Sequence, residues 1–139
     1  MKLTTYIEGT SLIGPAFADW ASAQPVLLGQ QAYIASKTVL PAPAVLPPAE
    51  RRRTGAIVKL SLAVGIAACE DAQQDPKTLP CVYTSSSGDG DNCHAICEAL
   101  ASSDRAISPT RFHNSVHNAA PGYWGIATGA MTNVSVLCA

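Results

Sequence analysis

Apolar residues in the second half of the chain recur at two spacings, one typical of helices and one typical of strands. Residues 51–72 place Ile57, Leu60 and Val64 on one helical face, with small residues at most other positions. Such a helix is expected to pack closely on more than one side. Further helices are predicted for residues 91–102 and 109–128, and strands for residues 79–84 and 133–138. The alternation predicts an α/β layer fold with a partly parallel sheet.

The first half of the chain carries a less regular pattern. Residues 2–8 alternate enough to predict a strand, and residues 16–23 predict a short helix. Residues 24–43 show no firm period and are expected to form a connection, with room for a short strand. Pro48 suits a first helical turn, because the backbone N–H that proline lacks would have no partner there. We expect residues 1–139 to form a single domain.

The segment 108–124, SPTRFHNSVHNAAPGYW, combines a helical spacing of apolar residues with many polar side chains. Ser108 is predicted to cap this helix with its hydroxyl, and Pro109 fits the first helical position. Gly122 is expected to allow another backbone to approach closely. The strand that follows is predicted to be buried. A buried helix with polar side chains that leads into a buried strand indicates a functional site.

Composition and charge narrow the possible functions. The chain is 47% hydrophobic and only 14% charged, with a mean hydropathy of +0.15, which is more apolar than a typical small domain. This excess predicts that the chain buries surface against a partner or against a further part of its own fold. A net charge of −1 argues against nucleic-acid binding. The basic cluster 51–53 favours a solvated helical turn or a surface salt bridge over an anion site.

The N-terminus and the cysteines indicate the cellular compartment of the protein. The first ten residues lack the apolar stretch of a secretion signal. The longest apolar run, residues 56–69, is interrupted by Lys59 and is too short to cross a bilayer, so we predict no membrane span. Five cysteines without framework spacing predict free, buried thiols and a cytoplasmic location.

Two possible metal sites are weighed and not favoured. Cys93 and Cys97, with His113 and His117, could supply four zinc ligands from two helices. Structural zinc sites usually use loop spacings, so we expect the thiols to pack against the sheet and the histidines to form hydrogen bonds. The run 89–92, DGDN, lacks the glutamate of a calcium loop and matches no nucleotide fingerprint. We therefore expect no metal and no cofactor, and Asp89 or Asp91 to cap the next helix.

Three segments together resemble one protein family. They are LPPAERRRTG at 46–55, SSSGDGDNCHAICEAL at 85–100, and the segment 108–124 followed by Gly129 and a short apolar strand. In these segments the chain is similar to the β-ketoacyl synthase N-terminal domain, in particular to the chain-length-factor-like proteins of aryl-polyene, type II fatty acid and polyketide synthases. The resemblance implies a thiolase-like fold with a mixed sheet packed with helices. It further implies that the chain holds the N-terminal half only and is truncated at Ala139.

The resemblance also implies a function. A chain-length factor does not catalyse by itself; it forms a heterodimer with a catalytic ketosynthase and shapes its acyl channel. Acyl chains would arrive on an acyl carrier protein, to whose docking Arg51, Arg52 and Arg53 could contribute. The alternative is a fragment of an active β-ketoacyl-ACP synthase, an acyltransferase that performs Claisen condensation. A free-standing binding module is disfavoured by the apolar excess and an exposed sheet edge.

Candidate site residues follow from the same resemblance. In the family, the helix corresponding to 92–100 lies at the dimer interface and closes the acyl channel, and Phe112 would be a bulky wall. The expected channel and interface residues are Asn92, Ala95, Ile96, Ala99, Arg111, Phe112 and Asn114. Cys138 is a candidate nucleophile, but it falls a few residues before the expected position, so we favour a buried strand cysteine. The three histidines lie in the wrong part of the pattern to complete a catalytic set.

Overall fold

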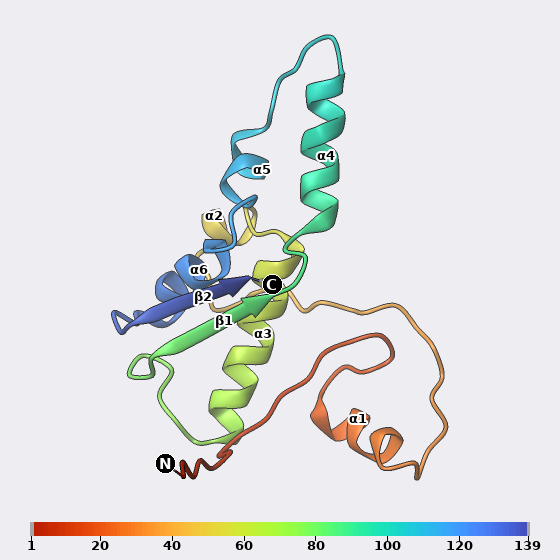
Figure 1. Ribbon diagram of the computed structural model, residues 1–139, viewed down its shortest axis with the longest axis vertical. Coiled ribbons are helices and arrows are strands. Elements are labelled where there is room, and N and C mark those ends of the chain that lie inside the picture. The colour runs from red at the N-terminus through yellow and green to blue at the C-terminus, as the bar shows by residue number, and fades with distance from the viewer. Residues whose placement is uncertain (1, 139) are drawn as a thin grey trace.

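The computed structural model describes residues 2–138, and in this range two parallel strands are joined by a run of three helices (Figure 1). The elements in chain order are α1 (Trp20–Leu27), α2 (Pro48–Arg51), α3 (Ala56–Asp71), β1 (Cys81–Ser85), α4 (Gly90–Ala101), α5 (Pro109–His113), α6 (Ala119–Thr128) and β2 (Val134–Cys138). Parallel strands need a long crossover connection, and α4, α5 and α6 provide it. The predicted α/β fold with a parallel sheet is confirmed.

The sheet is covered on one face only. Cys81 pairs in register with Val134, and Ser85 with Cys138. Cys81 and Tyr83 point toward the helices, whereas Val82 on the opposite face is exposed. In β2 only Val136 is partly buried, so the prediction of a buried final strand is wrong for the described residues. The physical reason is that α3 and α6 cover one face and nothing within residues 2–138 covers the other.

The core lies between α3, α6 and the inner face of the sheet. Its buried members are Leu46, Val58, Leu62, Tyr123 and Trp124. The predicted face of α3 is therefore wrong, because the buried positions begin one residue later than the expected series. Gly65 explains the shift: a β-carbon there would lie 2.6 Å from Cζ3 of Trp124, so the indole fills the space that a side chain would need. The expected close packing of this helix is confirmed on the side that faces α6.

Two predicted helices are shorter than expected, for local reasons. The helix expected from residue 51 begins at Ala56, because Thr54 turns back and donates its hydroxyl to the Arg51 carbonyl at 2.9 Å. The helix expected over 109–128 is divided into α5 and α6 by residues 114–118. Pro109 occupies the first turn as predicted, but Ser108 makes no side-chain cap. Nothing lies within 4 Å of a β-carbon on Gly122, so the expected close approach there is wrong.

Gly129 ends α6 with the left-handed backbone that its sequence position suggests. Its φ is 72°, and its N–H donates to the Gly125 carbonyl at 2.9 Å. A residue without a β-carbon adopts this conformation at little cost. The turn leads the chain directly into β2.

The N-terminal region differs most from expectation. Residues 2–8 form no strand, and Leu3, Tyr6 and Ile7 are exposed. The helix α1 begins at Trp20 rather than residue 16, because Asp19 caps it: the Ser22 N–H donates to Asp19 Oδ1 at 2.7 Å. Figure 1 shows α1 set apart from the sheet and its helices.

No helix of the described chain is both long enough and apolar enough to cross a membrane.

Burial of the core affects four ionisable groups. Burial raises the pKa of the Cys81 thiol, and burial together with the neighbouring Cys81, Asp75 and Glu70 raises that of Cys69. Burial likewise raises the pKa of the Tyr83 and Tyr123 hydroxyls; Glu50 adds to the effect at Tyr123 and Arg53 opposes it. These groups therefore favour their neutral forms in the folded protein.

Replacement of Gly65 by alanine should destabilise the protein. The added methyl group would clash with the Trp124 ring, and overpacking of this kind costs about 1–3 kcal/mol, partly offset by the better helix propensity of alanine. Gly122→Ala is the matched control, since it lies in a helix with open space around it and should stabilise by about 0.5–1 kcal/mol. Urea denaturation of both variants measures the difference. Equal stability of the two would contradict the packing described here.

Stability should fall at alkaline pH. The ordinary pKa values are 9.0 for cysteine and 10.0 for tyrosine, and all four folded values are raised. The native state thus holds these protons more tightly than the unfolded state, so the contribution is complete below pH 9.0 and is lost as the pH rises above it. Thermal unfolding between neutral and alkaline pH tests this. Tyr83→Phe should reduce the loss above pH 10.0, and an unchanged profile would contradict the assignment.

Candidate functional site

The helices α4 and α5, with the segment between them, form an arm that projects from the sheet (Figure 1). We use "the arm" for residues 90–113. Asp89 starts α4 as its N-cap, with Oδ1 accepting the Asn92 N–H at 3.1 Å, so the predicted cap is confirmed. Ser102 follows the helix in an extended conformation and donates its hydroxyl to the Ala99 carbonyl at 2.7 Å. The arm is thus a helical hairpin with defined ends.

Two buried asparagine side chains fix the base of the arm. Asn92 Nδ2 donates to the Arg111 carbonyl at 2.9 Å and so joins α4 to α5. Asn114 Nδ2 donates to the carbonyls of Thr110 at 2.8 Å and Arg53 at 2.7 Å. Each asparagine is only 8% exposed. These amides connect three segments that are distant in sequence: the segment around Arg53, α4 and α5. Both asparagines therefore position the other residues of the arm.

The structure brings all seven predicted site residues together on the arm or at its base, in three environments. Asn92 and Asn114 are buried, as described above. The small or aliphatic residues of α4 are partly buried, and the two α5 residues are exposed, Phe112 with 67% of its surface accessible. The partly buried set comprises Ala95, Ile96 and Ala99, and the exposed set Arg111 and Phe112.

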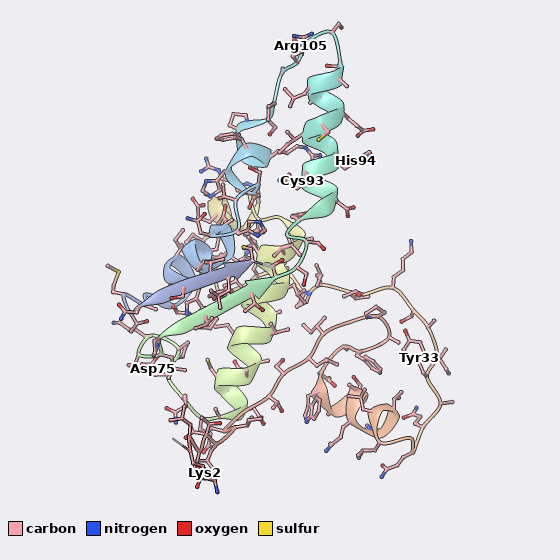
Figure 2. All side chains as sticks on the ribbon, in the orientation of Figure 1. Lys2, Tyr33, Asp75, Cys93, His94 and Arg105 are labelled. Carbon is pink, nitrogen blue, oxygen red and sulfur yellow. The ribbon has the colours of Figure 1, made fainter. Side chains whose placement is uncertain are left out.

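The remaining polar and thiol groups of the arm face solvent. Cys93 and Cys97 are exposed and free, so the prediction that they pack against the sheet is wrong. Figure 2 shows His94 on the side of α4 turned away from α5, where its Nε2 lies 3.5 Å from Glu98 Oε1. The ring of His113 meets Tyr123 edge-on at 5.7 Å instead of approaching a thiol. Within residues 2–138, no group of three or more His, Cys, Asp or Glu side chains could hold a metal ion.

A small cavity lies where the carboxyl end of β1 meets the base of the arm. Its volume is 60 Å³, and its polar lining includes Ser85, Asp89, Asn114 and His117. Such a space accommodates only a few water molecules. This cavity separates the arm from the end of the sheet without offering room for an acyl chain.

Cys138 is at the carboxyl end of β2, directly across from Ser85. Its thiol is free and exposed, so the interpretation as a buried strand cysteine is wrong. Cys138 lies two residues after Val136 and therefore on the same face of the sheet, and it is exposed because it stands at the end of the strand. Whether Cys138 reacts with acyl groups stays a prediction.

Sequence reasoning missed one feature of the site, the meeting of Arg111 with the basic cluster. Arg52, Arg53 and Arg111 line a common pocket, although they are almost sixty residues apart. The RRR triplet was visible in the sequence. That Arg111 would lie near this triplet depends on the hydrogen bond from Asn114 to the Arg53 carbonyl. The sequence carries no local signal for that bond.

Comparison with known proteins identifies the family. Residues 20–139 match the sequence model described as "Beta-ketoacyl synthase, N-terminal domain". This match covers most of the chain, and the chain therefore belongs to the β-ketoacyl synthase N-terminal domain family. The predicted family and its thiolase-like fold are confirmed.

A solved structure supports the more specific resemblance. The complex of the ketosynthase ApeO with its chain length factor ApeC from Xenorhabdus doucetiae contains a chain with 27% sequence identity and a TM-score of 0.74. The alignment covers 99% of this chain and 56% of that chain, so the present chain spans little more than half the length of the relative. None of the curated proteins matches. The chain is thus similar to one chain of a ketosynthase and chain-length-factor complex.

Replacement of Asn114 by alanine should loosen the base of the arm. The Arg53 carbonyl would lose its partner in a partly buried setting, which costs about 1 kcal/mol. Ser115→Ala is the matched control, because Ser115 makes an exposed, local hydrogen bond to the Phe112 carbonyl and should change stability by less than about 0.5 kcal/mol. Chemical denaturation compares the two. Equal effects would contradict the role given to the Asn114 amide.

Proposed function

We propose that this protein is a ketosynthase-like chain-length-factor subunit that pairs with a catalytic β-ketoacyl-ACP synthase. The observation that carries the proposal is the exposure of apolar side chains on the arm, whose base is held in place by the hydrogen bonds of Asn92 and Asn114. Leu100 is 48% exposed and Phe112 67% exposed, and Cys93 and Cys97 of α4 are exposed as well. Apolar groups collected on a projecting element are typical of a surface that a protein partner covers.

The proposed role of the arm is to form a wall of the partner's acyl channel. Ala95, Ile96 and Ala99 give α4 a low-bulk surface, and Phe112 supplies a large ring from α5. A wall of this kind sets the space available to a growing chain through its volume and takes no part in bond making. The similarity to a chain of the ApeO–ApeC pair supports this role.

The proposal includes an acyl carrier protein as the source of the acyl chains, and a cytoplasmic location. Arg52 and Arg53 are exposed at the foot of the arm and are available to an acidic partner. Arg51 is less available, because its Nη2 donates to the carbonyls of Ala44 and Leu46 at 3.0 Å each. All five cysteines are free, which suits a reducing compartment.

An active β-ketoacyl-ACP synthase is the second candidate function. The family match and the exposed thiol of Cys138 at the end of a parallel strand favour it, since ligands of α/β sheets bind at the carboxyl ends of strands. In that case a cysteine thiolate takes up the acyl group before condensation. The two candidates differ in whether acyl transfer requires a thiol of this chain.

Co-expression with a ketosynthase from the same gene neighbourhood tests the proposal. We expect a stable heterodimer, and Phe112→Ala should weaken it by at least about tenfold, since a buried phenyl ring contributes about 2 kcal/mol. Ile96→Trp should shorten the products of malonyl-dependent elongation by filling the channel. Met131→Ala is the control: this residue is 96% exposed, lies outside the arm and should change neither property.

Three outcomes would contradict the proposal. Absence of pairing would remove its basis, and pairing with unchanged product lengths would exclude the channel role. Acyl transfer by this chain without a partner, abolished by Cys138→Ala, would establish the enzyme instead.

A further inference from the structure

The buried polar side chains of the described chain gather at one pocket. Thr54, Asn92 and Asn114 are the polar residues classed as buried within residues 2–138, each 8% exposed, and all three line a cavity of 290 Å³. We call it the arginine pocket. It lies between the segment that follows α2 and the base of the arm. Burial of a polar side chain is costly unless it forms hydrogen bonds, and each of these three donates to a backbone carbonyl, which fixes the shape of the pocket.

The rim of the arginine pocket is strongly basic. Arg52, Arg53 and Arg111 line it, and no aspartate or glutamate does. Arg53 has one loose contact with a carboxylate, 3.7 Å from its Nη1 to Glu50 Oε1, and both side chains are partly solvated. Arg52 and Arg111 have no ion pair within the described part of the chain. Three arginines therefore line a pocket whose own lining holds no carboxylate, and two carboxylates lie beside it: Glu50, and Asp89, whose Oδ2 is 2.8 Å from the position of a β-carbon on Gly55.

Uncommitted hydroxyl groups complete the lining. Ser108 and Thr110 both line the pocket, and Ser108 does not use its hydroxyl to cap α5. The lining thus combines positive charge with free hydroxyl donors.

We propose that the arginine pocket binds a phosphoryl group. Guanidinium groups bind phosphate and carboxylate oxygens through paired N–H donors, and three of them match a dianion better than a single carboxylate. The hydroxyls of Ser108 and Thr110 add donors to the same oxygens. The group would belong to a free phosphorylated small molecule or to a phosphorylated segment of another protein.

Phosphate binding goes beyond the proposed function. It shares Arg52 and Arg53 with the proposed carrier-protein contact, but it does not require pairing with a ketosynthase. The measurement uses this protein without a ketosynthase. A failure to bind phosphate would leave the pairing experiment untouched, and the reverse also holds.

Titration with inorganic phosphate at constant ionic strength, followed by calorimetry, tests the pocket. We expect saturable binding at one site, and Arg111→Gln should weaken it by about tenfold, because hydrogen bonds to charged groups are the strong ones. The Arg111 side chain makes no hydrogen bond within the described residues, so this variant should fold, and its melting temperature checks that it does. Arg105→Gln is the matched control: it removes the same charge from the tip of the arm (Figure 2) and should leave the affinity unchanged.

The result that would overturn the proposal is binding without saturation, or equal weakening by Arg111→Gln and Arg105→Gln. Either one would indicate diffuse attraction between charges instead of a pocket. Two further probes separate the sources of the group, glycerol phosphate and a phosphoserine peptide. Equal affinities support a free small molecule, and a peptide that binds at least about tenfold more tightly supports a protein partner. Failure of both probes to bind overturns the proposal.

Discussion

The side-chain amide of Asn114 is the interaction on which the functional part of the molecule depends. Its two hydrogen bonds reach the carbonyls of Arg53 and Thr110 and so join the segment before α3 to the helix α5. Asn92 extends the connection to α4 through the Arg111 carbonyl. The position of the arm, the meeting of three arginines and the exposure of Phe112 all follow from these few contacts. Polar contacts thus hold the arm in place, while the apolar core holds α3, α6 and the sheet together.

The body itself has an unusual balance of covered and open surface. Trp124 fills the space above Gly65 and locks α6 onto α3, and the inner face of β1 packs on the result. Parallel sheets are normally covered on both faces, yet here Val82 and Leu137 remain exposed on the outer one. The apolar excess of the composition therefore has a structural location: much of it is exposed along residues 2–8 and 20–45, on the arm and on this outer face. Each of these surfaces is one that another part of a larger assembly would normally cover.

Much of the fold could be predicted from local signals, and the errors share a cause. The pattern located both strands and the helices α3 and α4 to within a few residues. It could not show that the Asn114 side chain would form a hydrogen bond to the Thr110 carbonyl, where α5 ends early. Nor could it show that Trp124 would pack against Gly65, so that a different face of α3 is buried from the one predicted. The strand expected over 2–8 does not form, because these residues pair with neither of the two open sheet edges. The seven site residues came from family resemblance; their division into buried, partly buried and exposed groups required the structure.

The way the arm is anchored has a mechanical consequence. The asparagine contacts hold the end of α4 near Asn92, while the twelve-residue helix continues to Ala101. It therefore acts as a cantilever about 18 Å long. A tilt of about 10° at its root displaces the free end by about 3 Å, which is on the order of the length of two carbon–carbon bonds. A small repacking around Asn92 would therefore move Leu100 far enough to change its contacts with a neighbouring molecule.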